Sequence, residues 1–433
     1  MTASLTDTRS AELYRRALKR IPGGVNSPVR AMRAIGRDPI FIERGEGAEI
    51  VDVDGNRYLD YVCSWGPLIH GHAHPDVLAA VTGAAAKGTS FGAPTPGEVE
   101  LAGEVAARME GVQMLRMTSS GTEATMTAVR LARAATGRSR VLKFAGAYHG
   151  HLDGLLAEAG SGLATQALPA SPGVLPSAAA ETVVIPWNDP EALLAATQGS
   201  ELAAIIAEPL PANMGLVPAR SGFLELLRAC ADATGALLLL DEVISGFRVA
   251  RGGAQELAGV RGDLTIMGKV IGGGLPAAAV GGPAELMEML APAGSVYQAG
   301  TLSGNPLAVA AGLATLELLD EEAYMRLAAI TEKLATGLRE VGAGHPIQVV
   351  SAPGLLTVFF SKGPVNSFAD AAACDLDTYG TWCRELLGRG VYPPPSQFEA
   401  WFPSLAHEGE QIERTLEAAA AAFAALPGED APA

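Results

Sequence analysis

Between residues 75 and 320, apolar runs of strand length alternate with segments of helical periodicity. The runs contain aliphatic and β-branched residues at successive positions, which is typical of strands that are buried on both faces. Alternation of such strands with helices predicts a mostly parallel sheet covered by helices. We therefore expect an α/β domain over residues 75–320, with strands at QMLRMT, RVLKF, TVVIPW, LAAIIAEPL and GALLLLDEV.

The two ends of the chain have a different pattern. Residues 1–74 begin with a helical segment, SAELYRRALKRI, and continue with short strands around the turn dipeptide Asp54–Gly55. Residues 321–433 predict helices and a pair of strands, PIQVVSAPGLLTVFF. These strands can pair with the early ones, so we expect a smaller α+β domain built from both chain ends. A long stretch rich in Gly, Ser, Pro and Ala, residues 151–178, is typical of a lid or of a disordered segment.

Composition narrows the classes of partner. The 433-residue chain has a net charge of −16 and shows no basic cluster, which disfavours nucleic acid and anionic membranes. It has no apolar run of ~18 residues and no apolar signal core near its start, so we expect neither a membrane span nor a signal peptide. The four cysteines lack C-x-x-C and zinc-ligand spacing, which predicts reduced thiols of a cytoplasmic protein and no metal site.

Lys269 stands out because an apolar run precedes it and three glycines follow it, in TIMGKVIGGGLP. Lysine is rarely buried without a partner, and burial lowers its pKa. The side chain of Lys269 either carries its charge to water or is kept as a neutral amine for chemistry.

The segment GGGLPA fits a dinucleotide-binding fingerprint only formally, because Pro276 lies inside it and a lysine precedes it. A nicotinamide dehydrogenase is therefore disfavoured.

Two further sites lie where predicted strands end. Asp241 ends the apolar strand LLLLDEV, at the edge where open α/β sheets bind ligands. Ser120, Gly121 and Thr122 lie at a strand-to-helix junction, where free N–H groups favour a phosphate. Each has a plain structural alternative, since Asp can cap a turn and SSGTEA can form a helix N-cap with Glu123.

An aromatic–histidine pair, Tyr148 and His149, follows the strand RVLKF, and such a pair alone usually reflects packing. Together, however, these groups match the needs of one cofactor, pyridoxal 5′-phosphate. Its aldehyde requires a lysine, its pyridine nitrogen requires a carboxylate, its phosphate suits a helix N-terminus, and its ring stacks on an aromatic plane. Asp241 and Lys269 are separated by one predicted helix–strand unit, so they can reach opposite ends of one ring.

In these residues the chain resembles the class III, fold-type-I pyridoxal-phosphate enzymes, and more narrowly the glutamate-1-semialdehyde 2,1-aminomutases. The resemblance implies a large domain with a mostly parallel seven-stranded sheet and a smaller α+β domain. The Asp and Lys signatures are shared by class III aminotransferases in general, whereas GGVNSPVR, AGSG and PSQFEA are more specific to the aminomutases. The matching motifs are IPGGVNSPVRA, DVDGNRYLDYV, SWGPLIHGHAHP, SSGTEATMTAVRLARAATGR, KFAGAYHGHLD, EAGSGLAT, LPASPGV, AEPLPANMGLV, DEVISGFRV, GKVIGGGLP, YQAGTLSGNPLA and PPPSQFEAWFPSLAH.

The resemblance also implies roles for individual residues. Catalytic roles fall to Lys269, Asp241 and Tyr148. The cofactor contacts that it implies are Ser120, Gly121, Thr122, Tyr148, His149, Asn213, Asp241, Lys269 and, from a neighbouring subunit, Thr301. The substrate contacts that it implies are Ser27, Arg30, Trp65, Ser161, Glu208 and Glu399.

The activity implied is transfer of an amino group within one carbon chain, which converts glutamate-1-semialdehyde to 5-aminolevulinate for tetrapyrrole biosynthesis. It uses pyridoxamine and pyridoxal 5′-phosphate and passes through 4,5-diaminovalerate, which a lid around Gly160 and Gly162 would retain. The family also implies a homodimer and a complex with glutamyl-tRNA reductase.

The alternative function is that of a class III ω-aminotransferase, which uses an external amine donor. A cofactor-binding regulator without turnover fits less well, because no DNA-binding module is evident.

Overall fold

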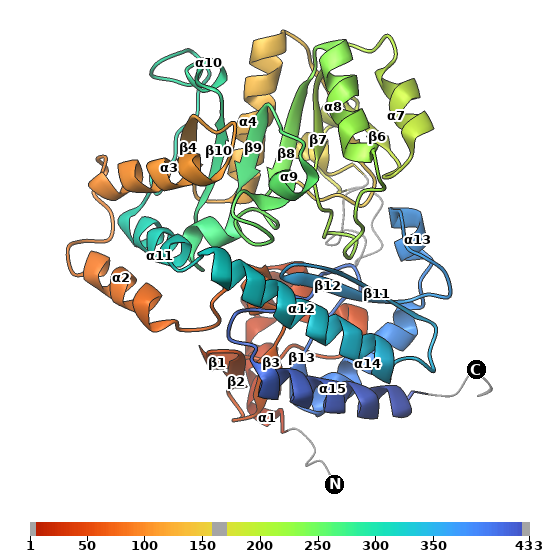
Figure 1. Cartoon of the computed structure of the whole chain (residues 1–433). Helices are drawn as coiled ribbons and strands as arrows, with labels where there is room; N and C mark the ends of the chain where they lie inside the picture. The colour runs from red at the N-terminus through yellow and green to blue at the C-terminus, as the bar shows by residue number, and fades with distance from the viewer. Residues whose placement is uncertain (1–5, 158–170, 427–433) are drawn as a thin grey trace.

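The computed structural model describes residues 6–157 and 171–426, which form two parts that face each other (Figure 1). The upper part in Figure 1 contains a seven-stranded sheet with the strand order β4-β10-β9-β8-β7-β5-β6. All of these strands run parallel except β10, which is antiparallel to β4 and β9. The strands are β4 (Met114–Thr118), β5 (Arg140–Phe144), β6 (Thr182–Ile185), β7 (Leu202–Ala207), β8 (Leu237–Glu242), β9 (Leu264–Met267) and β10 (Ala278–Gly282). The predicted mostly parallel sheet is confirmed.

Helices cover both faces of this sheet, because side chains alternate along each central strand. On β8, Leu239 packs in the same cluster as Ala128 of α4, whereas Leu238 and Leu240 pack with Leu227 of α8. The helices of this part are α2 (Pro75–Ala85), α3 (Pro96–Arg108), α4 (Gly121–Thr136), α6 (Pro176–Ala179), α7 (Pro190–Thr197), α8 (Phe223–Thr234), α9 (Gly253–Ala258), α10 (Ala284–Met287) and α11 (Pro306–Glu317). Burial on both faces explains why these strands are apolar at successive positions.

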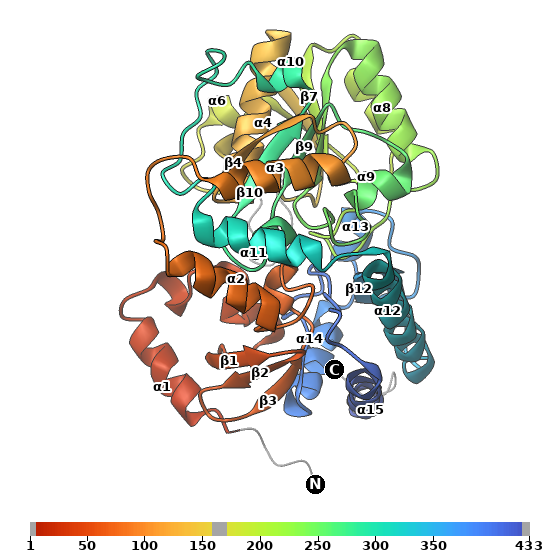
Figure 2. The same ribbon diagram turned by 60° about the vertical axis from the view of Figure 1, so that its left-hand side comes forward.

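The lower part combines the two ends of the chain (Figures 1 and 2). A four-stranded sheet has the order β1-β2-β3-β13, and β13 pairs in parallel with β3 through Val391 and Leu59. Strands from the two chain ends therefore do pair, but the strands predicted to do so, β11 and β12, form a separate two-stranded sheet, so that part of the prediction was wrong. The elements are α1 (Thr8–Ala17), β1 (Ile42–Glu46), β2 (Glu49–Asp52), β3 (Arg57–Asp60), α12 (Glu321–Val341), β11 (Ile347–Ala352), β12 (Leu355–Phe360), α13 (Phe368–Ala372), α14 (Leu376–Gly388), β13 (Val391–Tyr392) and α15 (Gly409–Ala424).

One apolar cluster joins the two chain ends in this lower part. Tyr58 and Leu59 of β3 pack in it with Trp382 of α14 and Phe423 of α15. Burial of such large side chains stabilises the part by roughly 1.5–3 kcal/mol for each one. Domain boundaries at residues 74 and 320 stay predictions.

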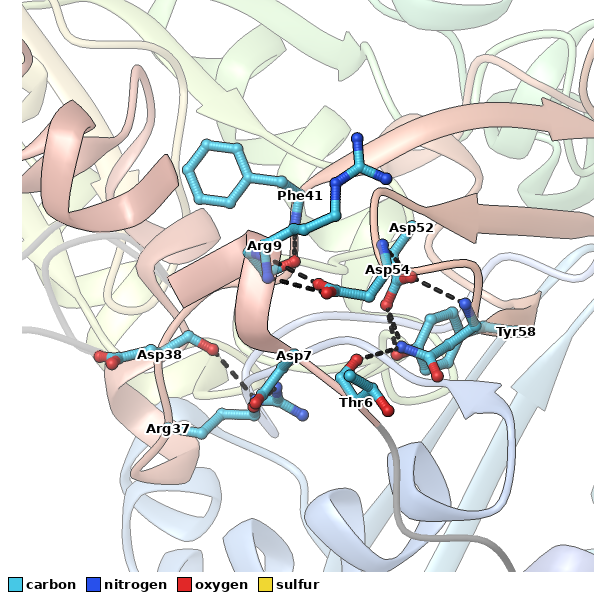
Figure 3. A network of polar contacts seen from close by, with 11 residues as sticks. Thr6, Asp7, Arg9, Arg37, Asp38, Phe41, Asp52, Asp54 and Tyr58 are labelled. Atoms are coloured by element: carbon cyan, nitrogen blue, oxygen red, sulfur yellow. Dashed lines mark hydrogen bonds and ion pairs between the residues drawn. The ribbon is translucent and has the colours of Figure 1, made fainter. Parts of the chain in front are cut away.

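Polar contacts hold α1 on the turn between β2 and β3 (Figure 3). The carboxylate of Asp54 accepts hydrogen bonds from the backbone N–H groups of Arg9 and Ser10, at 2.8 and 2.9 Å. The first N–H groups of a helix have no partner inside it, so Asp54 acts as a cap supplied from another element. Asn56 adds a hydrogen bond from Nδ2 to the carbonyl of Thr6 at 2.6 Å.

The predicted lid lies partly outside the described residues. Its described flanks contain a 3₁₀ turn at Asp153–Leu155 and the start of α6. Residues 158–170, with Gly160, Ser161 and Gly162, are not described. Other 3₁₀ turns are Pro22–Gly24, Pro28–Ala31, Arg33–Ile35, Cys63–Trp65 and Lys269–Gly272. None of the described helices is long and apolar enough to cross a membrane.

Candidate active site

Six parallel strands bring their carboxyl ends to one edge of the large sheet. The segments that leave β4, β5, β7, β8 and β9 each carry polar residues of interest, because ligands of open α/β sheets bind outside this edge. There they line one cavity of about 170 Å³. Its lining residues are Gly121, Thr122, Thr125, Tyr148, His149, Gly150, Glu208, Asn213, Asp241, Val243, Ile244 and Lys269.

Asp241 is a buried carboxylate at the end of β8. Its Oδ2 lies 2.7 Å from Nδ1 of His149, and its Oδ1 accepts a hydrogen bond from the backbone N–H of Val243 at 3.0 Å. Burial lowers the pKa of His149, although Asp241 acts in the opposite direction. The neutral imidazole then donates from Nδ1 to Asp241, which fixes the orientation of the carboxylate.

Lys269 follows β9 and lies at the start of a 3₁₀ turn, with a left-handed backbone φ of 48°. Few residues other than glycine adopt such a φ, and those that do are enriched at functional sites. Burial lowers the pKa of its amine, whereas Asp241, Glu399 and Glu208 act to raise it. A lowered pKa increases the fraction of neutral amine, the form that can act as a nucleophile or as a base.

Glu208 is a second buried carboxyl group in the cavity. Its Oε2 accepts hydrogen bonds from Nδ2 of Asn213 at 2.9 Å and from the backbone N–H of Ala212 at 3.1 Å. Burial, and then the charge of Asp241, raise the pKa of Glu208 to about 8. Near neutral pH this group is therefore mainly protonated, so it can donate a hydrogen bond.

The N-terminus of α4 borders the same cavity. Ser120 is its N-cap and accepts a hydrogen bond from the backbone N–H of Glu123 at 3.3 Å. The backbone N–H groups of Gly121 and Thr122, in the first turn, are left for a ligand, and the helix dipole favours an anion there. Thr125 faces the cavity one turn further along.

These residues fit pyridoxal 5′-phosphate. Three buried polar atoms of the lining have no hydrogen-bond partner among the described residues: Oγ1 of Thr125, Nε2 of His149 and Oε1 of Glu208. Buried polar atoms without partners are uncommon in native proteins, and a polar ligand accounts for them. The donors at α4 suit a phosphate, Asp241 suits a pyridinium nitrogen, and Lys269 suits an aldehyde.

Other residues proposed from the sequence lie outside the described lining of this cavity. Glu399 is nevertheless close enough to affect the pKa of both Tyr148 and Lys269. Trp65 precedes Gly66, whose backbone lies against the side chain of Lys269. Arg30 and Thr301 are exposed and Ser27 is half-buried, while Ser161 lies outside the described residues.

Two residues near the site escaped the sequence analysis. The sequence could have identified Thr125, because it lies three positions after Thr122 and therefore on the same face of α4. Arg248 lies within the segment DEVISGFRV, which carried the resemblance, but it was not singled out. Its guanidinium is fully buried and binds backbone carbonyl groups, which have no signature in a sequence.

Comparison with known proteins agrees with this geometry. The sequence profile of the family "Aminotransferase class-III" matches residues 32–423. A glutamate-1-semialdehyde 2,1-aminomutase of Desulforudis audaxviator (strain MP104C) is 56% identical over 420 residues, which are 96% of this chain and 97% of that protein. Glutamate-1-semialdehyde 2,1-aminomutase 2 of Brevibacillus brevis (strain 47) is 54% identical, over 95% of this chain and 97% of that protein.

Solved structures share the fold over nearly the whole chain. An ω-transaminase from Sphaerobacter thermophilus is 34% identical with a TM-score of 0.88, over 96% of this chain and 97% of that one. A glutamate-1-semialdehyde aminomutase variant from Pseudomonas aeruginosa PAO1, in complex with PMP, is 27% identical with a TM-score of 0.86, over 97% and 95%. The two TM-scores are too similar to distinguish the two activities, whereas the 54–56% identity to the two curated aminomutases above favours the aminomutase activity.

Proposed function

Since the chain belongs to the class III aminotransferase family, we propose that it converts glutamate-1-semialdehyde to 5-aminolevulinate for tetrapyrrole biosynthesis. One observation favours the aminomutase over the other activities of the family. Relatives named as aminomutases are 54–56% identical over at least 95% of the chain. The cavity at the sheet edge supplies a lysine, two carboxyl groups and a helix N-terminus for the chemistry.

Each group of the chain has a role in this reaction. Pyridoxal or pyridoxamine 5′-phosphate, when bound, accepts the electrons of a carbanion and carries the amino group. Lys269 would bind the cofactor, and its amine would move a proton between a carbon of the cofactor and a carbon of the substrate. Asp241, oriented by His149, keeps a proton on the pyridine nitrogen. The N-terminus of α4, with Thr122, holds the phosphate.

The remaining residues orient substrate and exclude water. Glu208, protonated near neutral pH, donates a hydrogen bond from Oε1 into the cavity, while Asn213 holds its other oxygen. Tyr148 covers the ring from the segment after β5. Ser27, Arg30, Trp65, Ser161 and Glu399 complete the substrate pocket in this proposal, with Arg30 as the cation for a substrate carboxylate.

The decisive experiment supplies purified, cofactor-loaded protein with glutamate-1-semialdehyde and no amine donor. An aminomutase needs no external amine, so we expect many turnovers to 5-aminolevulinate per active site. Product that forms only after an amine donor is added would establish the ω-aminotransferase instead. The variant Lys269→Ala should abolish turnover, whereas Lys333→Ala, which removes an exposed lysine, should not.

We also propose that two copies of the chain form the active unit. Helix α2 is largely apolar, yet none of its residues is fully buried, and Leu78 on it is 50% exposed. Phe91 and Leu302 are exposed to a similar extent, and Thr301, the proposed phosphate contact of the partner, adjoins Leu302. Figure 2 shows α2 beside α11, at the junction of the two parts.

Sedimentation distinguishes a dimer from a monomer. Leu78→Asp should shift the protein toward monomer, because a charge in an apolar interface remains without a partner. Leu194→Asp on α7 is the matched control, because Leu194 is also 50% exposed and should leave the mass unchanged. Equal masses for the wild type and both variants would contradict an interface at α2.

Two finer statements belong to the same proposal. The four cysteines are free and buried, which supports a reducing compartment such as the cytoplasm. A complex with glutamyl-tRNA reductase would pass the reactive aldehyde directly between the two enzymes. Co-sedimentation of the two purified proteins tests this complex.

A further inference from the structure

The segment Cys63–Gly66 forms an unusual turn beside Lys269. Its four residues have left-handed φ values of 44°, 58°, 68° and 112°, and the first three are Cys63, Ser64 and Trp65. Side chains disfavour this conformation, so a run of three such residues persists only where the surroundings enforce it. The groups that hold this turn are therefore part of the architecture of the site.

Asp60 holds the start of the turn. Its Oδ1 accepts a hydrogen bond from the backbone N–H of Val62 at 2.8 Å, and its Oδ2 accepts one from the backbone N–H of Cys63 at 3.1 Å. Nε2 of His72 lies 2.7 Å from the same Oδ2. The carboxylate of Asp60 is thus bound on several sides and fixes where the chain enters the turn.

Arg248 holds the end of the turn. Its Nη1 donates to the carbonyl of Gly66 at 2.7 Å, while Nη2 donates to the carbonyl of Pro403 at 2.8 Å and Nε donates to the carbonyl of Gly354 at 3.0 Å. The guanidinium is fully buried and lies 5.1 Å from the ring centre of Phe402. Among the described residues, no Asp or Glu forms an ion pair with it.

The three carbonyl groups come from segments that are far apart in the sequence. Gly66 lies after β3 of the four-stranded sheet, Gly354 lies in the turn between β11 and β12, and Pro403 lies after β13. Arg248 itself follows β8, seven residues after Asp241. One side chain thus joins the strand that carries Asp241 to segments from both chain ends.

The turn lies against Lys269. A Cβ atom placed on Gly66 would lie 3.3 Å from Cδ of Lys269 and 2.9 Å from the ring of Phe402. The lysine side chain therefore passes along the backbone of the turn, and Trp65 is attached to the same backbone. Burial lowers the pKa of Lys269, and the charge of Arg248 acts in the same direction.

We propose that Arg248 is a positioning residue, whose planar guanidinium binds three backbone carbonyl groups and thereby holds the left-handed turn at Trp65 and Gly66 against Lys269. This inference rests on the proposed function only for the role of Lys269. Lysine cannot replace arginine here, because a single ammonium does not present three donors in a fixed plane.

Fluorescence of the cofactor-free protein tests the proposal without any turnover. Trp65 is partly exposed, whereas Trp187, Trp382 and Trp401 are nearly fully buried, so acrylamide should quench mainly Trp65. Subtraction of the Trp65→Phe background isolates its signal. In Arg248→Lys the turn should open more often, and the quenching constant of Trp65 should rise about twofold or more.

Arg108→Lys is the matched control. Arg108 is also buried and donates to two backbone carbonyl groups, of Leu316 at 2.7 Å and of Leu319 at 3.0 Å, but outside the site. The control should lose thermal stability as Arg248→Lys does, with unchanged Trp65 quenching. A rise in quenching of equal size in both variants, or in neither, overturns the proposal.

Activity gives a second readout on the cofactor-loaded protein. A displaced turn should lower kcat in Arg248→Lys by about 10- to 100-fold, since small misplacements near reacting groups are costly, and Arg108→Lys should stay near the wild type. If Arg248→Lys fails to fold, Asp60→Asn loosens the other end of the turn, and its Trp65 quenching should rise in the same way. If the proposed function is wrong, turnover is absent in the wild type as well, while the fluorescence result still decides the role of Arg248.

Discussion

Asp241 and His149 form a buried pair, with Oδ2 of the carboxylate 2.7 Å from Nδ1 of the imidazole. The pair joins the end of β8 to the segment that follows β5, across the intervening strand β7. The aspartate is thereby fixed in one orientation before any ligand binds. Pre-organised charge of this kind is the main means by which enzymes stabilise transition states.

We expect Asp241→Asn to keep the shape of the site and to remove its charge. The amide cannot hold a proton on a pyridine nitrogen, so kcat should fall by ~10²–10³-fold with little change in stability. Asp263→Asn is the control, because Asp263 lies before β9 at the opposite edge of the sheet and accepts a hydrogen bond from the backbone N–H of Leu238. A kcat for Asp263→Asn as low as that of Asp241→Asn would argue against a specific role for the charge of Asp241.

The raised pKa of Glu208 predicts a pH-dependent stability. The pKa is about 8 in the folded chain, against 4.5 for an unperturbed glutamate, so the folded state keeps a proton over this interval that the unfolded state loses. Stability of the cofactor-free protein should therefore fall as pH rises from 4.5 to 8, by at most about 1.4 kcal/mol per pH unit from this group. Glu208→Gln cannot ionise, so its stability relative to the wild type should rise over the same interval in urea titrations. Glu340→Gln, at an exposed site, should show no such trend.

The strand–helix alternation predicted every strand of the large sheet except β10, because strands buried on both faces leave a continuous apolar signal. It also placed Asp241 and Lys269 together, since β8 and β9 are adjacent parallel strands whose carboxyl ends meet. Strand β10 was not predicted, and its antiparallel direction had no signal of its own, because an antiparallel strand in a covered sheet has the same apolar pattern as a parallel one.

Long-range polar contacts account for most of what the sequence did not reveal. The partners of Arg248 are backbone carbonyl groups, and any residue type can supply these. The left-handed φ values at Cys63–Trp65 contradict the propensities of those residues and follow from tertiary contacts. Trp65 was identified only through the resemblance, and its place beside Lys269 depends on this turn.

Asp54 should control the order of α1. Desolvation acts to raise the pKa of Asp54, but hydrogen bonds from Arg9 and Ser10 lower it overall. Its stabilising effect is therefore present near neutral pH and is lost as pH falls through the lowered pKa, below about 3.8. Asp54→Ala should increase hydrogen exchange at the amides of Arg9 and Ser10. Asp38→Ala should not, because among the described residues the Asp38 carboxylate accepts no hydrogen bond from α1.

The two ends of the short helix α9 provide a matched test of the buried carboxylate of Glu242. Gly253 and Gly259 both have left-handed φ values, of 78° and 65°, so alanine incurs the same backbone strain at either position, about 1–2 kcal/mol. A Cβ atom on Gly259 meets nothing within 4 Å, whereas one on Gly253 lies 2.6 Å from both carboxylate oxygens of Glu242.

The difference between the two variants therefore measures the cost of displacing Glu242. This carboxylate accepts hydrogen bonds from the backbone N–H groups of Ala254 and Gln255, and burial raises its pKa to about 7. Gly253→Ala should unfold at lower denaturant concentration than Gly259→Ala, with a further loss of about 1–3 kcal/mol for the broken hydrogen bonds. Because Glu242 adjoins Asp241 on β8, Gly253→Ala should also lower kcat, while Gly259→Ala should not. Equal stability of the two variants would mean that the chain around Glu242 shifts to make room, and that its hydrogen bonds do not hold the end of β8 rigid.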